Sequence, residues 1–268
     1  MGTQRFVLGL EYDGASFSGW QTQPDNVNTV QDALERALST VANEPIATVC
    51  AGRTDAGVHA LGQVVHFDST AKRPLTAWVR GANAHLPDSV SVLWARSVNH
   101  DFHARFGAIA RHYRYMLLNR AVRPGLLSGR TGWHHRPLAL KPMQAAAEHL
   151  LGQHDFSSFR DAQCQAKNPV RNMLQVSVTQ HGDLYCFDFS ANAFLHHMVR
   201  NMVGSLIRVG LNEAQPQWIA ELLQQRDRRL AAPTAAPHGL YFVGPDYAPG
   251  QGIPARAPSA DALLVSAD

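Results

Sequence analysis

Hydrophobic positions recur along the chain in two periods, which predict short strands interleaved with amphipathic helices. Apolar residues at spacings of three and four over 29–43 predict a helix with Asn28 or Thr29 as its N-cap. Further helices are predicted at 75–87, 142–156, 193–210 and 215–227. Strands are predicted at 5–14, 46–52, 62–69, 90–98, 110–119 and 239–247. Alternation over 170–192, with a turn at His181-Gly182-Asp183, predicts a hairpin.

The order of these elements predicts an α+β fold of two related halves. The first hundred residues run strand, helix, strand, strand, helix, strand, and a similar order follows. We expect each half to be an antiparallel sheet with helices packed on one face. The predicted boundaries are 1–104 for the first half and 105–247 for the second. Residues 248–268, rich in Pro, Gly and Ala, are expected to form a flexible tail.

Composition narrows the class of protein. The 268 residues are 45% hydrophobic and 17% charged, which is typical of a globular protein. Apolar runs stay shorter than the ~18 residues that would span a bilayer, and the first residues show no secretory pattern, so we expect no membrane association. Three isolated cysteines indicate a reducing, cytoplasmic setting. The 14 histidines lack the spacing of a metal-ligand set, so we expect no bound metal.

Charge is distributed unevenly. The net charge is only +3, but residues 102–147 contain no Asp or Glu. The basic residues of this window are Arg105, Arg111, Arg114, Arg120, Arg123, Arg130, Arg136 and Lys141. Aromatic residues are interleaved with them, which is typical of a surface that binds nucleic acid. The alternative is a solvated strand face that happens to lack acids.

The stretch "AGRTDAGVHALGQVVHF", residues 51–67, holds one carboxylate on a loop before an apolar strand. Gly52 and Gly57 flank Asp55, and glycines tolerate the positive φ that a sharp turn requires. Such an aspartate commonly serves only to close a turn through its own backbone. Arg53, two residues away, favours a second interpretation, in which Asp55 is an ionised and oriented nucleophile or base.

Two residues of the second half are candidates for the same chemistry. Arg200 lies off the apolar face of its predicted helix and needs a carboxylate partner if it is buried, for which Asp55 is one candidate. The alternative is a surface arginine. Tyr113 lies within the acid-free window, where a ring can stack on a base and offer its hydroxyl. The alternative is a tyrosine of the core.

The Asp55 stretch resembles the signature loop of the tRNA pseudouridine synthases of the TruA family. The resemblance runs from about Phe6 to Tyr247, and the Asp55 loop and the "HHMVRN" helix are its most specific parts. Other segments resemble the family in the same order: "EYDGASFSGWQTQ", "VANEPI", "DFHARFGAIARHYRY", "LLGQHDFSSFR", "ANAFLHHMVRNMVGSL" and "GLYFVGPDY".

The resemblance implies an isomerase that converts uridine to pseudouridine at positions 38 to 40 in the anticodon stem–loop of tRNA. It implies a homodimer without cofactor or metal, whose halves join around a central RNA-binding cleft. Asp55 matches the essential aspartate, Tyr113 the tyrosine that packs on the target base, and Arg200 the basic partner of the aspartate. Arg53 matches the arginine that helps to displace the base, and Leu240 an apolar residue of the uracil pocket. Arg105, Arg111 and Arg114 are expected to contact the RNA.

Three other functions compete with this interpretation. An RNA-binding module without chemistry would keep the basic window but would not need Asp55 beside Arg53. A histidine- or metal-dependent hydrolase is suggested by the histidine count and disfavoured by the histidine spacing. A related synthase that acts on another RNA is opposed only by the resemblance of the whole chain.

Overall fold

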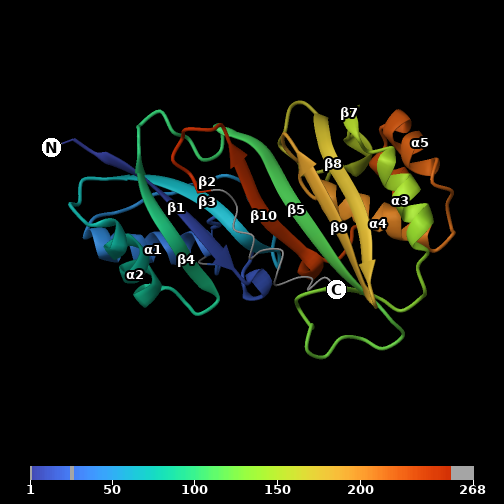
Figure 1. The fold of residues 1–268 in the computed structure, drawn as a ribbon, viewed down its shortest axis with the longest axis horizontal. Coiled ribbons are helices and arrows are strands. Elements are labelled where there is room, and N and C mark those ends of the chain that lie inside the picture. Colours follow the sequence, from blue (N-terminus) through green and yellow to red (C-terminus); the bar gives the residue numbers. More distant parts are fainter. Residues whose placement is uncertain (1, 25–26, 255–268) are drawn as a thin grey trace. The chain divides into compact units, whose positions relative to one another are not determined.

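The computed structural model describes residues 2–24 and 27–254, which form two compact units (Figure 1). The first unit comprises the described residues of Met1–Ile109 and Tyr241–Asp268, and the second is Ala110–Leu240. The predicted boundary at 104/105 lies five residues before the start of the second unit. The final strand, predicted as part of the second half, groups with the first unit because it pairs with a strand there. Residues 248–254 form no helix or strand, and the rest of the predicted tail lies outside the described residues.

The first unit is an α+β layer built on four long strands. Its elements are β1 (Gln4–Tyr12), η1 (Gly14–Ser16), α1 (Val30–Ala42), β2 (Val49–Cys50), β3 (His59–Ser69), α2 (Leu75–His85), β4 (Val90–Val98) and β10 (Leu240–Tyr247). The strand order is β4-β1-β3-β10, with β2 paired to β3. β1 is antiparallel to both β3 and β4, as predicted, whereas β10 is parallel to β3. The parallel pair arises because β10 enters the sheet after the whole second unit rather than through a hairpin.

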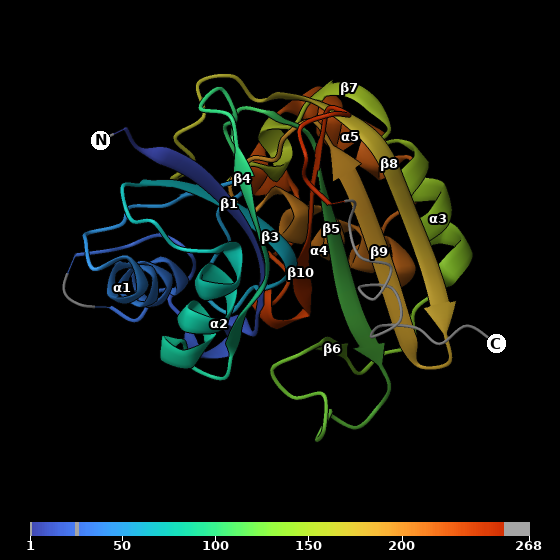
Figure 2. The same cartoon turned by 60° about the vertical axis from the view of Figure 1, so that its left-hand side comes forward.

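The two helices of the first unit lie on one side of its strands (Figure 2). The fully buried ring of Trp78 on α2 anchors them, with centroids 5.1 Å from Phe6 and 5.0 Å from Phe67. Helix α1 begins as predicted: the Thr29 hydroxyl accepts the Asp32 amide at 3.2 Å and donates to its carboxylate at 2.5 Å. The apolar periodicity therefore placed this helix correctly.

The second unit repeats the plan with a meander of strands. Its elements are β5 (Ala108–Asn119), β6 (Gly132–His134), α3 (Leu140–Glu148), β7 (Gly152–Asp155), η2 (Ser157–Phe159), β8 (Val170–His181), β9 (Leu184–Ala191), α4 (Met198–Gly210), α5 (Trp218–Gln225), η3 (Arg228–Leu230) and η4 (Pro237–Gly239). The strand order β5-β9-β8-β7 is antiparallel throughout, and β6 adds a short parallel pair to β5. The predicted hairpin is confirmed, with Gly182 at φ 58° in its turn. Helices α3, α4 and α5 gather on one side of β8 and β9 (Figure 1).

Three predicted helices are shorter than their sequence pattern suggests, and the one expected over 215–227 spans only Trp218–Gln225. The helix expected over 142–156 ends at Glu148, and 152–155 form β7 instead, because these residues pair with β8. The helix expected over 193–210 begins only at Met198, since His197 has φ 59° and cannot belong to an α-helix. The strand expected over 46–52 is reduced to two residues. None of the helices in the described part of the chain has both the length and the apolar character needed to cross a bilayer.

Candidate active site

Asp55 lies in a tight turn between β2 and β3. Its carbonyl accepts the Val58 amide at 3.1 Å, and Gly57 has φ 76° within this turn. The prediction of a left-handed glycine is therefore confirmed for Gly57 and wrong for Gly52, which is absent from the left-handed region. Asp55 is half-buried, whereas Arg53 is exposed. The turn thus fixes the backbone of Asp55, and its side chain is only partly covered.

The segment between β1 and α1 supports the Asp55 turn through its backbone. The Trp20 amide donates to the Thr54 carbonyl at 3.0 Å, and the Gly57 amide donates to the Phe17 carbonyl at 3.3 Å. Gly19 has φ 97°, and a Cβ there would lie 2.8 Å from the Thr54 carbonyl oxygen. The backbone at Gly19 and the backbone at Thr54 lie so close together that a side chain at Gly19 would force these two segments apart.

Buried side chains also form hydrogen bonds with residues of the same turn. The Tyr12 hydroxyl and the Thr54 hydroxyl are hydrogen-bonded at 2.8 Å, and burial raises the pKa of Tyr12. The Gln63 side-chain amide donates to the Gly52 carbonyl at 2.6 Å. Both Thr54 and Gln63 are buried, so these bonds are shielded from water. The loop is therefore rigid on both sides of Asp55.

Two arginines of the first unit influence the pKa of Cys50, the residue that ends β2 just before this loop. Burial raises the pKa of the Cys50 thiol to about 12, and the positive charges of Arg53 and Arg105 oppose that rise. The field of both guanidinium groups therefore reaches Cys50, at the end of β2. Arg105 is exposed as well as Arg53. Both arginines thus add positive charge near the strand end that leads into the Asp55 loop.

Tyr113 lies on β5 in the second unit and is half-buried. It faces Phe189 of β9 across the ladder, and its ring meets Phe194 edge-on with centroids 4.9 Å apart. Neighbouring arginines on β5 are held by β9 and by the residues that follow it. Arg114 forms an ion pair with Asp188 at 2.6 Å, and Arg111 donates to the Asn192 carbonyl at 2.9 Å.

Arg200 lies in the first turn of α4 and is tied to the chain after η3. Its Nε donates to the Ala235 carbonyl at 2.9 Å, and the Ala235 amide donates to the Arg200 carbonyl at 3.1 Å. One turn later, a Cβ at Gly204 would lie 2.1 Å from the Pro233 carbonyl oxygen. The close approach at Gly204 lets the 233–235 segment lie against the helix and orient the arginine.

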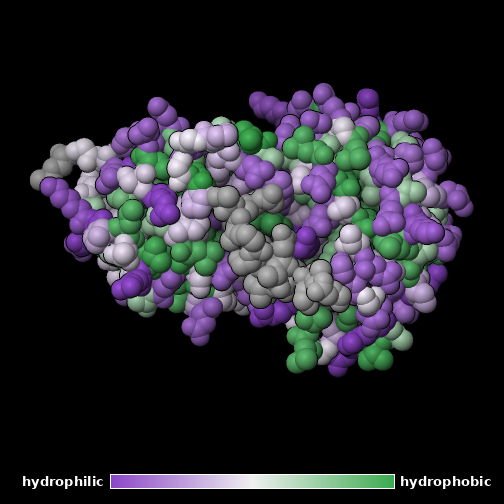
Figure 3. All heavy atoms as spheres, in the orientation of Figure 1, coloured by the Kyte–Doolittle hydropathy of each residue, from purple (hydrophilic) through white to green (hydrophobic). Residues whose placement is uncertain are grey.

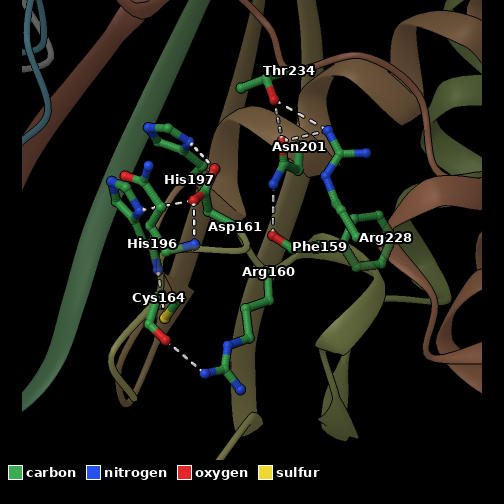
Figure 4. Close-up of polar contacts among 10 residues, drawn as sticks. Phe159, Arg160, Asp161, Cys164, His196, His197, Asn201, Arg228 and Thr234 are labelled. Carbon is green, nitrogen blue, oxygen red and sulfur yellow. Dashed lines mark hydrogen bonds and ion pairs between the residues drawn. The ribbon is translucent and has the colours of Figure 1, made fainter.

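A polar network fixes the next residue of α4 (Figure 4). The Asn201 side chain donates to the Phe159 carbonyl at 2.8 Å and accepts from Thr234 at 2.7 Å and from Arg228 at 3.1 Å. Asn201 is fully buried, and these bonds satisfy its side-chain amide. The network joins η2, η3 and α4 around the helix that carries Arg200.

The turn before α4 gathers a second polar cluster, formed by Asp161, Cys164, His196 and His197 (Figure 4). Nδ1 of His197 is 2.8 Å and Nδ1 of His196 is 3.5 Å from the Asp161 carboxylate, and the two rings stack at 3.9 Å. The His196 amide donates to the Cys164 sulfur at 3.5 Å. Burial raises the pKa of Asp161, but the Gln163 amide and His197 outweigh it, so the pKa is lowered overall. These residue types can bind metals. In this structure the Asp161 carboxylate instead lies against Nδ1 of both histidines.

Sequence analysis did not find Asp161 or Asn201. Neither lies in a local motif that suggests a role, and only the fold brings loop 157–168 against the start of α4. The His196–His197 pair is visible in the sequence, where the histidine spacing argues against a metal-ligand set. That spacing gives no sign of the Asp161 carboxylate opposite the two rings.

Leu240 opens β10 and is 5% exposed. It follows Gly239, where a Cβ would lie 2.6 Å from the Met116 carbonyl oxygen. Nearby, the Tyr115 hydroxyl donates to the Ala236 carbonyl at 3.0 Å. This close packing at Gly239 fixes the place of Leu240.

The predicted site residues therefore fall on both units. Arg53, Asp55 and Arg105 belong to the first unit. The second unit holds Arg111, Tyr113, Arg114, Arg200 and Leu240. In the acid-free window, Arg136 pairs with Glu213 at 2.6 Å, as Arg114 pairs with Asp188. Some of the charge of this window is thus neutralised within the protein.

Comparison with known proteins identifies the family. A family model described as tRNA pseudouridine synthase matches residues 10–107 and 146–248, more than half of the chain. The chain belongs to the tRNA pseudouridine synthase family. The first matched segment of this isomerase family contains the Asp55 loop, and the second contains α4.

Curated members of the tRNA pseudouridine synthase family match nearly the whole chain. The tRNA pseudouridine synthase A of Dechloromonas aromatica is 60% identical over 250 residues, which cover 93% of this chain and 95% of the relative. The enzyme of the same name from Nitrosomonas eutropha is 58% identical and covers 91% and 87%. That of Vibrio campbellii is 53% identical and covers 93% and 94%.

Proposed function

We propose that this protein isomerises uridine to pseudouridine at positions 38, 39 and 40 in the anticodon stem–loop of tRNA, with Asp55 as the nucleophile. The observation that carries the proposal is the Asp55 turn, where a half-buried carboxylate is locked by backbone bonds from the 17–20 segment. That turn lies in the part of the chain that the family model matches. The names of the relatives support tRNA as the substrate.

The reaction requires that the target uracil be extruded from the base stack of the RNA. The N1–C1′ bond breaks, the uracil turns, a C5–C1′ bond forms and the C5 proton is lost while N1 gains one. Product and substrate are isomers, so the proposal includes no cofactor and no metal. Extrusion of the base costs a few kcal/mol of unstacking. Arg53, exposed two residues before Asp55, occupies the space that the base leaves.

Asp55 acts in its ionised form, since a protonated acid can neither attack the ribose or the base nor remove a proton. Arg200 is proposed as the basic residue that keeps Asp55 ionised. The bonds of Arg200 to Ala235 support this role, because they fix the direction of the guanidinium before substrate arrives. A preorganised cation costs no rearrangement at the moment of reaction.

Tyr113 is the proposed platform for the flipped uracil and the group that takes the C5 proton. The edge-on contact with Phe194 supports this role, because it holds the ring in one orientation. A stacked base gains about 1–3 kcal/mol on such a ring. Leu240 lines the uracil pocket, and Arg105, Arg111 and Arg114 contact the RNA. Arg114 contributes less field than the others, because Asp188 pairs with it.

We also infer that the protein is a cytoplasmic homodimer with tRNA lying across both subunits. Sedimentation equilibrium, with and without tRNA, tests this part of the proposal. A monomer that remains fully active would contradict the dimer without affecting the proposed chemistry.

The deciding experiment maps the modified positions. An unmodified tRNA transcript with uridines at 38, 39 and 40 is incubated with the protein, and pseudouridine is located by carbodiimide adducts and primer extension. We expect modification at these three positions and none in a transcript with cytidine at each of them. Pseudouridine at other positions would overturn the site assignment, and none at all would overturn the function.

A further inference from the structure

Phe106 is a large aromatic residue with no place in the core. It is 77% exposed, in a turn of the first unit that leads into β5. Ile109, three residues later, is 57% exposed. An exposed aromatic ring offers a face on which an unpaired nucleobase can stack.

The turn that carries Phe106 is rigid. Nδ1 of His103 accepts the amides of Arg105 and Phe106 at 3.2 and 3.1 Å, and the Gly107 amide donates to the His103 carbonyl at 2.8 Å. His103 must therefore present a bare Nδ1, and burial lowers its pKa, which favours the neutral ring. The Tyr247 hydroxyl donates to the Ala104 carbonyl at 2.7 Å. The Ala104 amide donates to Nδ1 of His66 at 3.1 Å.

The ring of Phe106 also ends a row of rings in tilted and edge-on contact. It lies 4.4 Å from His103, which lies 4.7 Å from the buried ring of His66. Burial lowers the pKa of His66 to about 4, so the row stays uncharged at neutral pH. Arg105 lies over the Phe106 ring with Cζ 5.6 Å from the centroid. The exposed ring is therefore held before any partner arrives, which reduces the entropy cost of binding.

Arg105 places a positive charge against the Phe106 ring, with Cζ 5.6 Å from the centroid. The His103 ring, which the Phe106 ring meets, also meets His66, and His66 lies opposite Val49 of β2, the strand that leads into the Asp55 loop. A ring covered by a guanidinium group suits a nucleotide, because the ring stacks on the base and the cation meets phosphate. A second copy of this chain suits it less, since a two-fold contact centred here would place Arg105 against its own copy.

We propose that Phe106 is a base-stacking residue, which binds an unpaired nucleobase of the substrate RNA beside the uridine at Asp55, while Arg105 binds an adjoining phosphate. This inference rests on the proposed function. It adds a base contact in the first unit to the proposed contact between Tyr113, in the second unit, and the target base. The contact adds affinity for unpaired RNA next to the target, and it does not take part in bond making.

The test compares three substitutions of Phe106 in the full chain, with an anticodon stem–loop transcript as ligand. Phe106→Ala and Phe106→Leu are expected to weaken binding about 5- to 150-fold, since both remove the π-face. Phe106→Trp is expected to bind as tightly as the unchanged protein. The rate at saturating RNA should change little in all three. Leu93→Ala, which truncates another exposed apolar side chain of the first unit, is the control and should bind normally.

Fluorescence provides a readout that is independent of turnover. In the Phe106→Trp, Asp55→Asn double variant, RNA should quench the new indole emission, measured against the Asp55→Asn parent. Full affinity in Phe106→Leu, or no quenching, would overturn the inference while leaving a protein that modifies tRNA. A Phe106→Ala variant whose sedimentation changes while its RNA affinity does not would assign the ring to a contact between copies. Failure of the proposed function would appear separately, as absence of pseudouridine with the unchanged protein.

Discussion

The Asp55 loop in the first unit and the start of helix α4 in the second are held by different kinds of interaction. The loop is fixed mainly by backbone hydrogen bonds from the 17–20 segment. This segment lies close to the loop at Gly19, where any side chain would displace the Thr54 backbone. The start of α4 is fixed by side chains, through Asn201 and the Asp161 cluster. The loop positions Asp55 and the start of α4 positions Arg200, the two charged residues to which catalytic roles are proposed.

The difference teaches where each region is vulnerable. Backbone contacts do not titrate, so the loop should be insensitive to pH and sensitive to added volume. Side-chain contacts depend on charge and hydrogen-bond partners, so the start of α4 should respond to polar substitutions and to acid. The chemistry itself should depend on the groups that the two regions present.

The largest effect is expected from Asp55→Asn. The amide cannot act as a nucleophile or base, so turnover should fall below about a hundredth of the original rate. Affinity for tRNA should stay within a few-fold, because phosphate contacts dominate binding. Single-turnover kinetics and filter binding measure the two quantities. A variant that keeps more than this rate would remove Asp55 from the role of nucleophile.

Tyr113→Phe separates stacking from proton transfer in the second unit. The ring and its contact with Phe194 survive, and only the hydroxyl is lost. If the hydroxyl takes the C5 proton, the rate should fall by about 10²–10⁴ with unchanged affinity. Release of tritium from C5-labelled uridine follows this step directly. A rate close to that of the unchanged protein would leave Tyr113 as a platform only.

Gly19→Ala tests the backbone support of the Asp55 loop. A Cβ there lies 2.8 Å from the Thr54 carbonyl oxygen at φ 97°, so the free energy of unfolding should fall by about 1–3 kcal/mol. Urea denaturation measures this change. Gly125→Ala is the control, because nothing lies within 4 Å of its Cβ and no positive φ is involved. Equal stability of both variants would show that the loop adapts, against the comparison drawn above.

The smallest effect is expected from Asp161→Asn at the start of α4. The pKa of Asp161 is lower in the fold than in the unfolded chain, so its charge stabilises the protein above the unfolded pKa, about 3.9. That stabilisation is lost as the pH falls through the folded pKa. We expect a deficit of about 0.2–1 kcal/mol at pH 7 that shrinks towards pH 3.

Denaturation curves between pH 7 and pH 3 check the Asp161 prediction. Asp183→Asn, an exposed acid in the hairpin turn of the same unit, is the control. A deficit that is independent of pH would mean that Asp161 acts through packing alone. The start of α4 would then resemble the Asp55 loop in how it is held.

The sequence by itself determined the elements whose signals are local. Thr29 caps α1, the alternation around Gly182 forms a hairpin, and Gly57 turns the chain beside Asp55, all as predicted. These features depend on residues a few positions apart, so periodicity and capping chemistry are enough to find them. The resemblance to the family, carried by motifs along the chain, supplied the candidate residues and the activity.

Only the tertiary structure decided the rest. It converted 152–155 from predicted helix to strand β7, placed β10 parallel to β3, and set Asp188 beside Arg114. It also left Phe106 exposed on a turn braced by His103, and brought Asp161 to the start of α4. The physical reason is common to all of these: each depends on which distant segment supplies a hydrogen-bond partner, a countercharge or a covering side chain. No local pattern of apolar and polar residues records that choice.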